Sequence, residues 1–347
     1  MIRAGIVGLA FAGLAVLAAD GGTAQSSGQG QTSVGKQQSG APSPAAGAPS
    51  QQLGWITLGT QGGPIPSGER SEPANLLVVE GQPWIVDCGD GAMDRLAAAG
   101  FNPVQVNVAF ISHLHVDHIG GLSALIGLRW FIGAKDVLTI YGPPGTDALV
   151  KGILESLTPT VRIGLGVGSS GPTPEQLTRV VIVQDGSDLT VNGVRVRAVR
   201  NSHFDESAGQ PDDDGSQSLS YRYDYKGYGI GYTGDTGPSD AVTRLEQGAD
   251  TLVSEVIDLP AMEAFIRQVP DAVRAPQAKA AIIHHFETQH LTPQEAGAIA
   301  AHAGVRRLVF THLSIIGTTN AEVPKLVSEA HETFRGEVIV AHDLDKF

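Results

Sequence analysis

The sequence predicts an α/β fold, and three observations support this prediction. From residue 53 onward, short apolar runs alternate with segments whose apolar residues recur at the helical period. Hydrophobic residues make up 41% of the 347-residue chain and charged residues 17%, a normal balance for a protein with a sizeable core. Lys226-Gly227 separates two alternating runs, as a hairpin turn does. The length suits one large α/β domain or two small ones.

The expected elements follow in chain order. Apolar runs predict strands at 55–58, 76–79, 84–86, 106–111, 137–141, 180–183, 191–199, 219–225, 228–232, 251–254, 307–311 and 337–341. Helix-period segments predict helices at 92–99, 120–130, 145–157, 240–247, 293–303 and 323–334. Active sites of α/β folds assemble at the ends of strands, so polar residues that follow these runs are the natural site candidates.

Residues 1–24 have the pattern of a cleaved export signal. Arg3 precedes an unbroken apolar run at 4–19, and Gly22-Thr23-Ala24 fits a cleavage site. The run of about 16 residues is short for a membrane span, which needs roughly 20. An uncleaved N-terminal anchor is the alternative. We therefore expect a periplasmic or secreted protein that has no membrane attachment after cleavage.

Residues 25–52 predict a disordered linker. They are rich in Ser, Gln, Gly, Pro and Ala, and Lys36 is their only charged residue. Such a segment cannot bury enough apolar surface to offset the entropy of ordering it. The folded domain is therefore expected at 53–347. Cys88 is the only cysteine, so no intrachain disulfide can form.

The chain is strongly acidic, with a formal net charge of −13. Proteins that grip nucleic acid through its phosphates usually carry a basic patch or stripe, and Lys and Arg are sparse here. We therefore expect no nucleic-acid partner. A small substrate with a phosphate group remains compatible, because bound metal ions can supply positive charge locally.

The strongest chemical signal is a cluster of four potential metal ligands, His113, His115, Asp117 and His118, which directly follows the apolar run 106–111. Residues two apart on an extended backbone point to the same side, so the first two histidines can share one ion. The turn after them lets the aspartate and the last histidine face a second ion. Imidazole and carboxylate ligands suit zinc, with manganese or iron as alternatives.

One turn cannot complete two metal sites, so further ligands are expected elsewhere. His203, Asp235 and His312 each follow a predicted strand. Each of them alone has an ordinary reading as a loop or turn residue. Together with the first cluster, they predict a site with two metal ions. For His284 and His285, the spacing gives no reason to expect a ligand role.

The order of these motifs resembles the metallo-β-lactamase superfamily, and more narrowly its tRNase Z-like and arylsulfatase-like branch. The matching residues are His-Leu-His-Val-Asp-His-Ile-Gly-Gly at 113–121, Ser202-His203, Gly234-Asp235-Thr236-Gly237, Thr311-His312-Leu313-Ser314, Leu58-Gly59-Thr60, Asp87-Cys88-Gly89-Asp90-Gly91, Tyr141-Gly142-Pro143-Pro144-Gly145, Glu255 and His290. The resemblance covers about 53–347. It implies a four-layer αββα sandwich with the metals at one edge of the two sheets.

The resemblance also implies two ligand sets that share one aspartate. The first ion would be held by His113, His115, His203 and Asp235. The second ion would be held by Asp117, His118, Asp235 and His312. Asp87 matches a residue that supports the histidine turn. Glu255 and His290 match a carboxylate–imidazole pair beside the metals, although a histidine in the entry to a capped helix is the alternative for His290.

Three departures from the family pattern bear on the substrate. Val116 stands where the tRNase Z pattern usually has Gly, and Asp90 stands where it has Glu. Members that process tRNA also carry a long protruding arm, whereas the matching stretch 163–173 is a short Gly/Ser run without lysine. Together with the acidity and the export signal, this argues against tRNA as the substrate.

The expected function is therefore that of an exported di-zinc hydrolase of small phosphodiesters or aryl sulfate esters. A hydroxide bridging the two ions would attack the ester, and Asp117 would orient it or carry its proton. His290, held in one tautomer by Glu255, would donate to a substrate oxygen or leaving group. The alternatives are a β-lactam or lactone hydrolase of the same fold, or a non-catalytic metal-binding module. Families of this kind are often dimers, so a homodimer is compatible.

Overall fold

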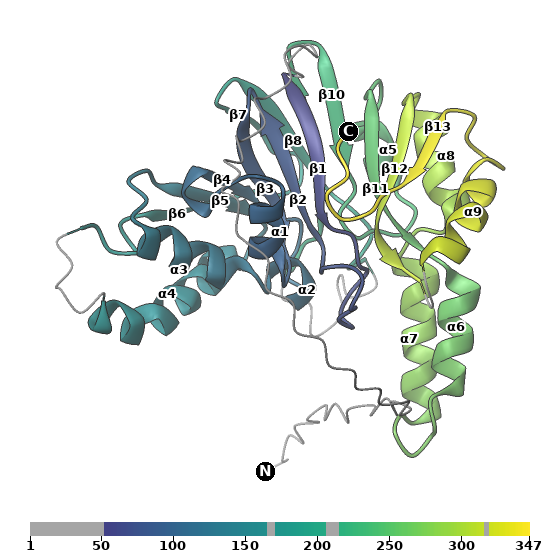
Figure 1. Ribbon diagram of the computed structural model, residues 1–347. Helices are drawn as coiled ribbons and strands as arrows, with labels where there is room; N and C mark the ends of the chain where they lie inside the picture. Colours follow the sequence, from purple (N-terminus) through teal and green to yellow (C-terminus); the bar gives the residue numbers. More distant parts are fainter. Residues whose placement is uncertain (1–51, 165–170, 206–214, 316–318) are drawn as a thin grey trace, which may run out of the picture.

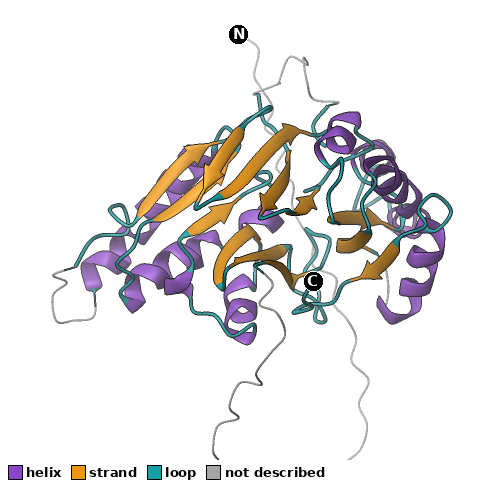
Figure 2. Ribbon diagram, turned by 90° about the horizontal axis from the view of Figure 1, so that it is seen from above, coloured by secondary structure: helices purple, strands orange, loops and turns teal. Residues whose placement is uncertain are grey.

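The computed structural model describes residues 52–164, 171–205, 215–315 and 319–347. Two β-sheets pack face to face, and helices cover the outer face of each sheet (Figure 1, Figure 2). This is the predicted four-layer αββα sandwich. The predicted signal segment 1–24, nearly all of the linker 25–52 and the middle of the stretch 163–173 lie outside the described residues.

The first sheet has six strands within the described residues, in the order β1-β2-β3-β4-β5-β6. β1 to β3 are antiparallel neighbours, and β3 to β6 are parallel neighbours. The strands are β1 (Leu53–Gly59), β2 (Ala74–Val79), β3 (Gln82–Cys88), β4 (Val108–Phe110), β5 (Leu138–Gly142) and β6 (Thr178–Ile182).

The second sheet has seven strands among the described residues, in the order β13-β12-β11-β10-β9-β8-β7. β10 to β13 are parallel neighbours, and β7 to β10 are antiparallel. The strands are β7 (Asp188–Val191), β8 (Val194–Arg200), β9 (Leu219–Tyr225), β10 (Tyr228–Tyr232), β11 (Thr251–Ile257), β12 (Arg307–Ser314) and β13 (Glu337–Val340).

The helices bury the outer faces of both sheets. On the first sheet these are α1 (Ala92–Ala98), α3 (Leu122–Ile132) and α4 (Thr146–Ile163), and on the second sheet α5 (Asp240–Leu245), α8 (Pro293–Ala303) and α9 (Thr319–Ala330). The short helices α2 (Val116–Ile119) and η1 (Pro103–Gln105) flank β4. No helix in the described ranges combines the length and the apolar character needed to cross a membrane.

The core between the sheets is aromatic near its centre. Trp55 of the first sheet lies with its ring 5.5 Å from that of Tyr232 in the second, and Phe110 contacts Tyr221 and Tyr223 edge-on at 5.4 Å. All five side chains are fully or almost fully buried. Aromatic pairs in these geometries contribute roughly 0.5–1.5 kcal/mol each beyond the area that they bury. The two sheets therefore hold a fixed relative position, and that position aligns the strand ends that carry the site.

Two details differ from the sequence prediction. The single strand expected at 191–199 is a hairpin, because Asn192 and Gly193 both have positive φ angles (46° and 84°) and reverse the chain between β7 and β8. Helices α6 (Leu259–Gln268) and α7 (Pro276–Gln289) were not predicted at all. Helix α7 buries only Ile283 and has a weak apolar period, so its sequence gives little sign of a helix. Helix α6 buries only Ile266 but is clearly amphipathic, so the sequence prediction overlooked a helical pattern that is present.

Candidate metal centre and active site

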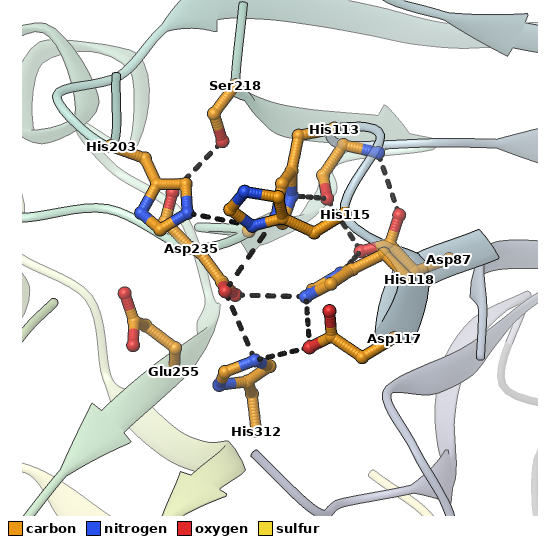
Figure 3. A network of polar contacts seen from close by, with 12 residues as sticks. Asp87, His113, His115, Asp117, His118, His203, Ser218, Asp235, Glu255 and His312 are labelled. Atoms are coloured by element: carbon orange, nitrogen blue, oxygen red, sulfur yellow. Dashed lines mark hydrogen bonds and ion pairs between the residues drawn. The ribbon is translucent and has the colours of Figure 1, made fainter. Parts of the chain in front are cut away.

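The turn after β4 presents its four polar residues to one space (Figure 3). His115 has an extended backbone immediately before α2 begins, and His118 and Asp117 lie within that helix. The change from extended to helical backbone separates the directions of the two pairs. His113 and His118 are fully buried, whereas Val116 between them is 67% exposed. The prediction that this turn gathers potential ligands therefore agrees with the geometry.

Asp87 supports this turn from the end of β3. Its φ angle is +56°, and the pairing of β2 with β3 is irregular here, which aims the carboxylate inward. The carboxylate accepts hydrogen bonds from the Ser112 N–H at 2.7 Å, the Ser112 hydroxyl at 2.7 Å and the Tyr232 hydroxyl at 2.7 Å. It also lies 2.8 Å from Nδ1 of His118. A carboxylate accepts only, so His118 carries its proton on Nδ1 and turns Nε2 toward the site.

The remaining candidate ligands come from three strands of the second sheet. His203 follows β8, Asp235 follows β10, and His312 lies within β12. At His312 the φ angle is +44°, and β12 has one residue more than β11 between matched pairs. A bulge of this kind redirects a side chain that would otherwise pack in the sheet, and such backbone strain is typical of functional sites.

The structure assembles these seven residues into two donor groups that share Asp235 (Figure 3). The first group is His113, His115, His203 and Asp235, and the second is Asp117, His118, Asp235 and His312. In each group, one ligand atom per residue lies within 4.8 Å of all the others. Within the second group, the Asp235 carboxylate lies 3.3 Å from Nε2 of His118 and 3.1 Å from Nε2 of His312.

Several atoms of this cluster have no hydrogen-bond partner in the described part of the chain. Nε2 of His118, both ring nitrogens of His312 and Oδ1 of Asp235 are buried in this way. In the first group, Nδ1 of His115 lies 3.0 Å from Nε2 of His113 and 3.3 Å from Nε2 of His203. Buried polar atoms without partners are costly, and converging nitrogens are typical of a metal site. The residues present therefore fit metal ions in both groups.

The protonation state of the three histidines in the first donor group also suits metal binding. Burial lowers the pKa of His113, His115 and His203, so these rings are neutral and offer lone pairs. Burial also disfavours the charged form of His118. The carboxylates of Asp235, Asp87 and Asp117 outweigh burial and raise the pKa of His118 well above its ordinary value.

Glu255 and His290 form a buried pair beside both donor groups, with the His290 ring 5.1 Å from that of His203 and 6.1 Å from that of His312. Glu255 lies at the irregularity between β11 and β12, where its Oε1 accepts a hydrogen bond from the Thr236 N–H at 2.6 Å. Its Oε2 lies 2.7 Å from Nδ1 of His290. His290 directly precedes the capping box that Thr292 and Glu295 form at the start of α8. The helix-entry reading of His290 and its pairing with Glu255 are thus both present in the structure.

Two further residues lie at this site: His285, for which the sequence indicated no ligand role, and Phe204, which the sequence analysis did not single out. His285 on α7 places Nε2 3.3 Å from Nε2 of His290, and burial lowers its pKa to about 4. With His203 and His290 it forms a third group of potential ligand atoms. The Phe204 ring lies 5.2 Å from His115 and 4.8 Å from His203. Because helix α7 was not predicted, no pattern pointed to His285, whereas Phe204 directly follows a candidate ligand.

Comparison with known proteins agrees with this geometry. The family model described as "Beta-lactamase superfamily domain" matches residues 84–313. A ribonuclease Z from Mycobacterium avium is 30% identical over 286 residues, which cover 81% of this chain and 90% of that protein. A ribonuclease Z from Mycobacterium bovis is 29% identical over 297 residues, which cover 84% and 96%.

Solved structures show the same fold. The short form of human tRNase Z aligns with a TM-score of 0.57 at 23% identity, over 85% of this chain and 98% of that one. The metallo-β-lactamase fold protein YhfI from Bacillus subtilis aligns with a TM-score of 0.59 at 20% identity, over 85% and 99%.

The prediction that this chain takes no nucleic-acid partner is wrong. The curated relatives that match most of its length are named ribonuclease Z, a name that states action on RNA. The error came from the net charge, which is a property of the whole chain. At a metal centre, bound cations supply the local positive charge that a phosphate needs, whatever the total. From its motifs, fold and relatives, the chain belongs to the metallo-β-lactamase superfamily, in its tRNase Z-like branch.

Proposed function

We propose that the protein is a two-zinc phosphodiesterase and that RNA is among its substrates. The observation that carries this proposal is the Glu255–His290 pair beside two donor groups that share Asp235. Neutral imidazoles with one carboxylate in the first group favour zinc. When bound, a pair of such ions would activate water and neutralise charge on the phosphoryl oxygens.

His290 is suited to donate a proton to the leaving oxygen. Its Nδ1 faces Oε2 of Glu255, so the carboxylate holds a proton on Nδ1 and fixes the ring plane. Burial disfavours the charged ring, but Glu255 outweighs this effect and raises the pKa of His290. A histidine that keeps its second proton on Nε2 is a general acid for an ester whose leaving oxygen is a poor leaving group.

Asp117 is suited to orient the attacking water. It is 9% exposed, and the His118 and His312 rings favour its charged form, which lowers its pKa to about 2 against the effect of burial. Its carboxylate packs against the backbone at Gly63, where a Cβ atom would approach Oδ2 to 2.3 Å. Any larger side chain at position 63 would have to displace Asp117, so glycine is required there.

Phosphodiester chemistry is also favoured by the relatives, whose name states action on RNA. The N-terminal segment 1–24 supports our further proposal that the enzyme is exported. Aryl sulfates and β-lactams use the same water activation, so they are the competing outcomes of the test.

The test is a substrate panel on zinc-loaded protein: bis(nitrophenyl) phosphate, nitrophenyl sulfate, a chromogenic cephalosporin and a labelled single-stranded RNA. We expect turnover of the phosphate diester and of RNA. His290→Ala should lose roughly 100-fold or more in kcat on RNA, whose leaving oxygen needs a proton. His302→Ala is the matched control, because His302 is an exposed histidine of α8. Rapid cephalosporin cleavage without phosphodiester turnover would refute the proposal.

A further inference from the structure

The helical hairpin α6–α7 extends away from the two sheets and returns to the body at His290 (Figure 1). Its last turn reaches the metal centre. The Gln289 carbonyl lies 2.9 Å from Nδ1 of His203, and the rings of His203 and His285 are 5.5 Å apart. The hairpin therefore places the His285 ring 5.1 Å from that of His290, the proposed general acid.

The hydrogen bonds of His285 define which of its nitrogens carries the proton. Its Nδ1 lies 2.7 Å from Oε1 of Gln289, four residues further along α7. An amide oxygen only accepts, so the proton is on Nδ1 and the lone pair is on Nε2. That lone pair faces Nε2 of His290 at 3.3 Å. When Nε2 of His290 is protonated, it therefore donates to Nε2 of His285. A substrate that takes the place of this hydrogen bond would meet a donor nitrogen and an acceptor nitrogen.

A third metal ion is a poor account of this arrangement, although His203, His285 and His290 lie close enough to hold one. Nδ1 of His203 faces the Gln289 carbonyl, and Nδ1 of His290 faces Glu255. The other nitrogen of His203 lies in the first donor group, 3.3 Å from Nδ1 of His115. An ion at the third position would therefore compete with the first metal site for His203.

We propose that His285 recognises a hydroxyl group next to the leaving oxygen and so makes the enzyme selective for RNA. The 2′- and 3′-oxygens of a ribose are bonded to adjacent carbons and lie about one hydrogen-bond length apart. This separation matches the distance between the Nε2 atoms of His285 and His290. The 3′-oxygen needs a proton as it leaves, and His290 supplies it. The 2′-hydroxyl has a hydrogen to donate, and His285 accepts it. DNA lacks this donor. This inference rests on the proposed phosphodiesterase function.

The bond changes follow from these roles. The water oxygen forms a bond to phosphorus while the bond from phosphorus to the 3′-oxygen breaks. The proton on Nε2 of His290 moves to the 3′-oxygen, and the proton released by the water replaces it. His285 accepts a hydrogen bond but removes no proton, so the 2′-hydroxyl stays intact. The products are a 3′-hydroxyl and a 5′-phosphate, with no cyclic phosphate.

The experiment uses oligonucleotides that carry ribose or 2′-deoxyribose only at the scissile nucleotide. For zinc-loaded wild-type protein, we expect kcat/KM to favour ribose by roughly 10-fold or more, the effect of one buried hydrogen bond. His285→Phe should bring this ratio close to one by slowing the ribose substrate alone. His285→Gln should restore part of the preference, because its amide oxygen can accept. His284→Phe, an exposed neighbour on the same helix, is the control.

A second readout needs no turnover. The affinity for a product oligonucleotide that ends in ribose should exceed the affinity for one that ends in deoxyribose, and His285→Phe should abolish the difference. A wild-type enzyme with no ribose preference would overturn the inference, as would equal losses on both substrates in His285→Phe or a 2′,3′-cyclic phosphate product. Bis(nitrophenyl) phosphate has no hydroxyl beside its leaving oxygen. If the enzyme cleaves bis(nitrophenyl) phosphate but shows no ribose preference on oligonucleotides, the phosphodiesterase function stands and only the role of His285 is refuted. If it cleaves no diester at all, both proposals are refuted.

Discussion

Replacing Asp87 by Asn tests how the second metal site is prepared. Asp87 is fully buried, and its carboxylate holds the proton of His118 on Nδ1. Oδ1 of the new side chain must still accept from the Ser112 N–H, so its NH2 group takes the place of Oδ2. Two donors cannot face each other, so His118 must move its proton to Nε2. Nε2 then offers no lone pair, and the second donor group loses a ligand.

The size of the effect follows from the contacts of Oδ2. This atom contacts the hydroxyls of Ser112 and Tyr232, which can rotate to accept from the amide, and His118, which cannot adapt without changing its tautomer. Each hydrogen bond to a charged group contributes about 1.5–3 kcal/mol, so we expect a loss of about 2–4 kcal/mol in the free energy of unfolding. Supporting residues of this kind typically change metal affinity by about 10- to 100-fold.

The assays are zinc content by mass spectrometry and thermal unfolding of metal-free protein. We expect Asp87→Asn to retain one zinc ion, held by the first donor group, and to unfold at a lower temperature. Asp90→Asn, at an exposed aspartate just after β3, should behave as wild type. An Asp87→Asn protein that binds two zinc ions with wild-type affinity would refute the tautomer argument.

Three further predictions concern other parts of the molecule. Asp235→Ala should lose both metal ions because both donor groups include this residue, whereas His203→Ala should lose one; equal zinc contents in the two variants would contradict the shared position. Burial raises the pKa of Glu246 to about 8, so the folded protein binds more protons than the unfolded chain between about pH 4.5 and 8, and stability falls as the pH rises through that window. In Glu246→Gln, the free energy of unfolding should decrease by up to about 5 kcal/mol less over this pH range than in the wild type. The melting temperatures of the variant at pH 5 and pH 8 should therefore differ less. Arg129→Met should lower the free energy of unfolding by about 3 kcal/mol or more in denaturant titrations, because the buried guanidinium donates to five acceptors, among them the Pro103 and Asp136 carbonyls; an unchanged midpoint would show that these bonds contribute nothing net.

The sequence by itself determined the fold class and the first half of the site. The His113–His118 turn could be predicted because its geometry is local: two residues on extended chain followed by a helical turn fix where four side chains point. The parallel strands that surround it also followed from local apolar patterns. Asp235 and His312 were candidates because each follows a predicted strand, and the resemblance assigned them to ligand sets. Only the bulge in β12 explains why His312 leaves the sheet and faces the site.

The tertiary structure alone decided the partners that depend on contacts between distant segments. Asp87 and Tyr232 are 145 residues apart, and their hydrogen bond exists because the two sheets pack face to face. His285 is placed beside His290 by helix α7, which buries only Ile283 and therefore shows almost no apolar period in the sequence. Composition also misled the expectation about nucleic acid, because net charge is summed over the chain whereas electrostatic recognition acts over a few ångströms at the site.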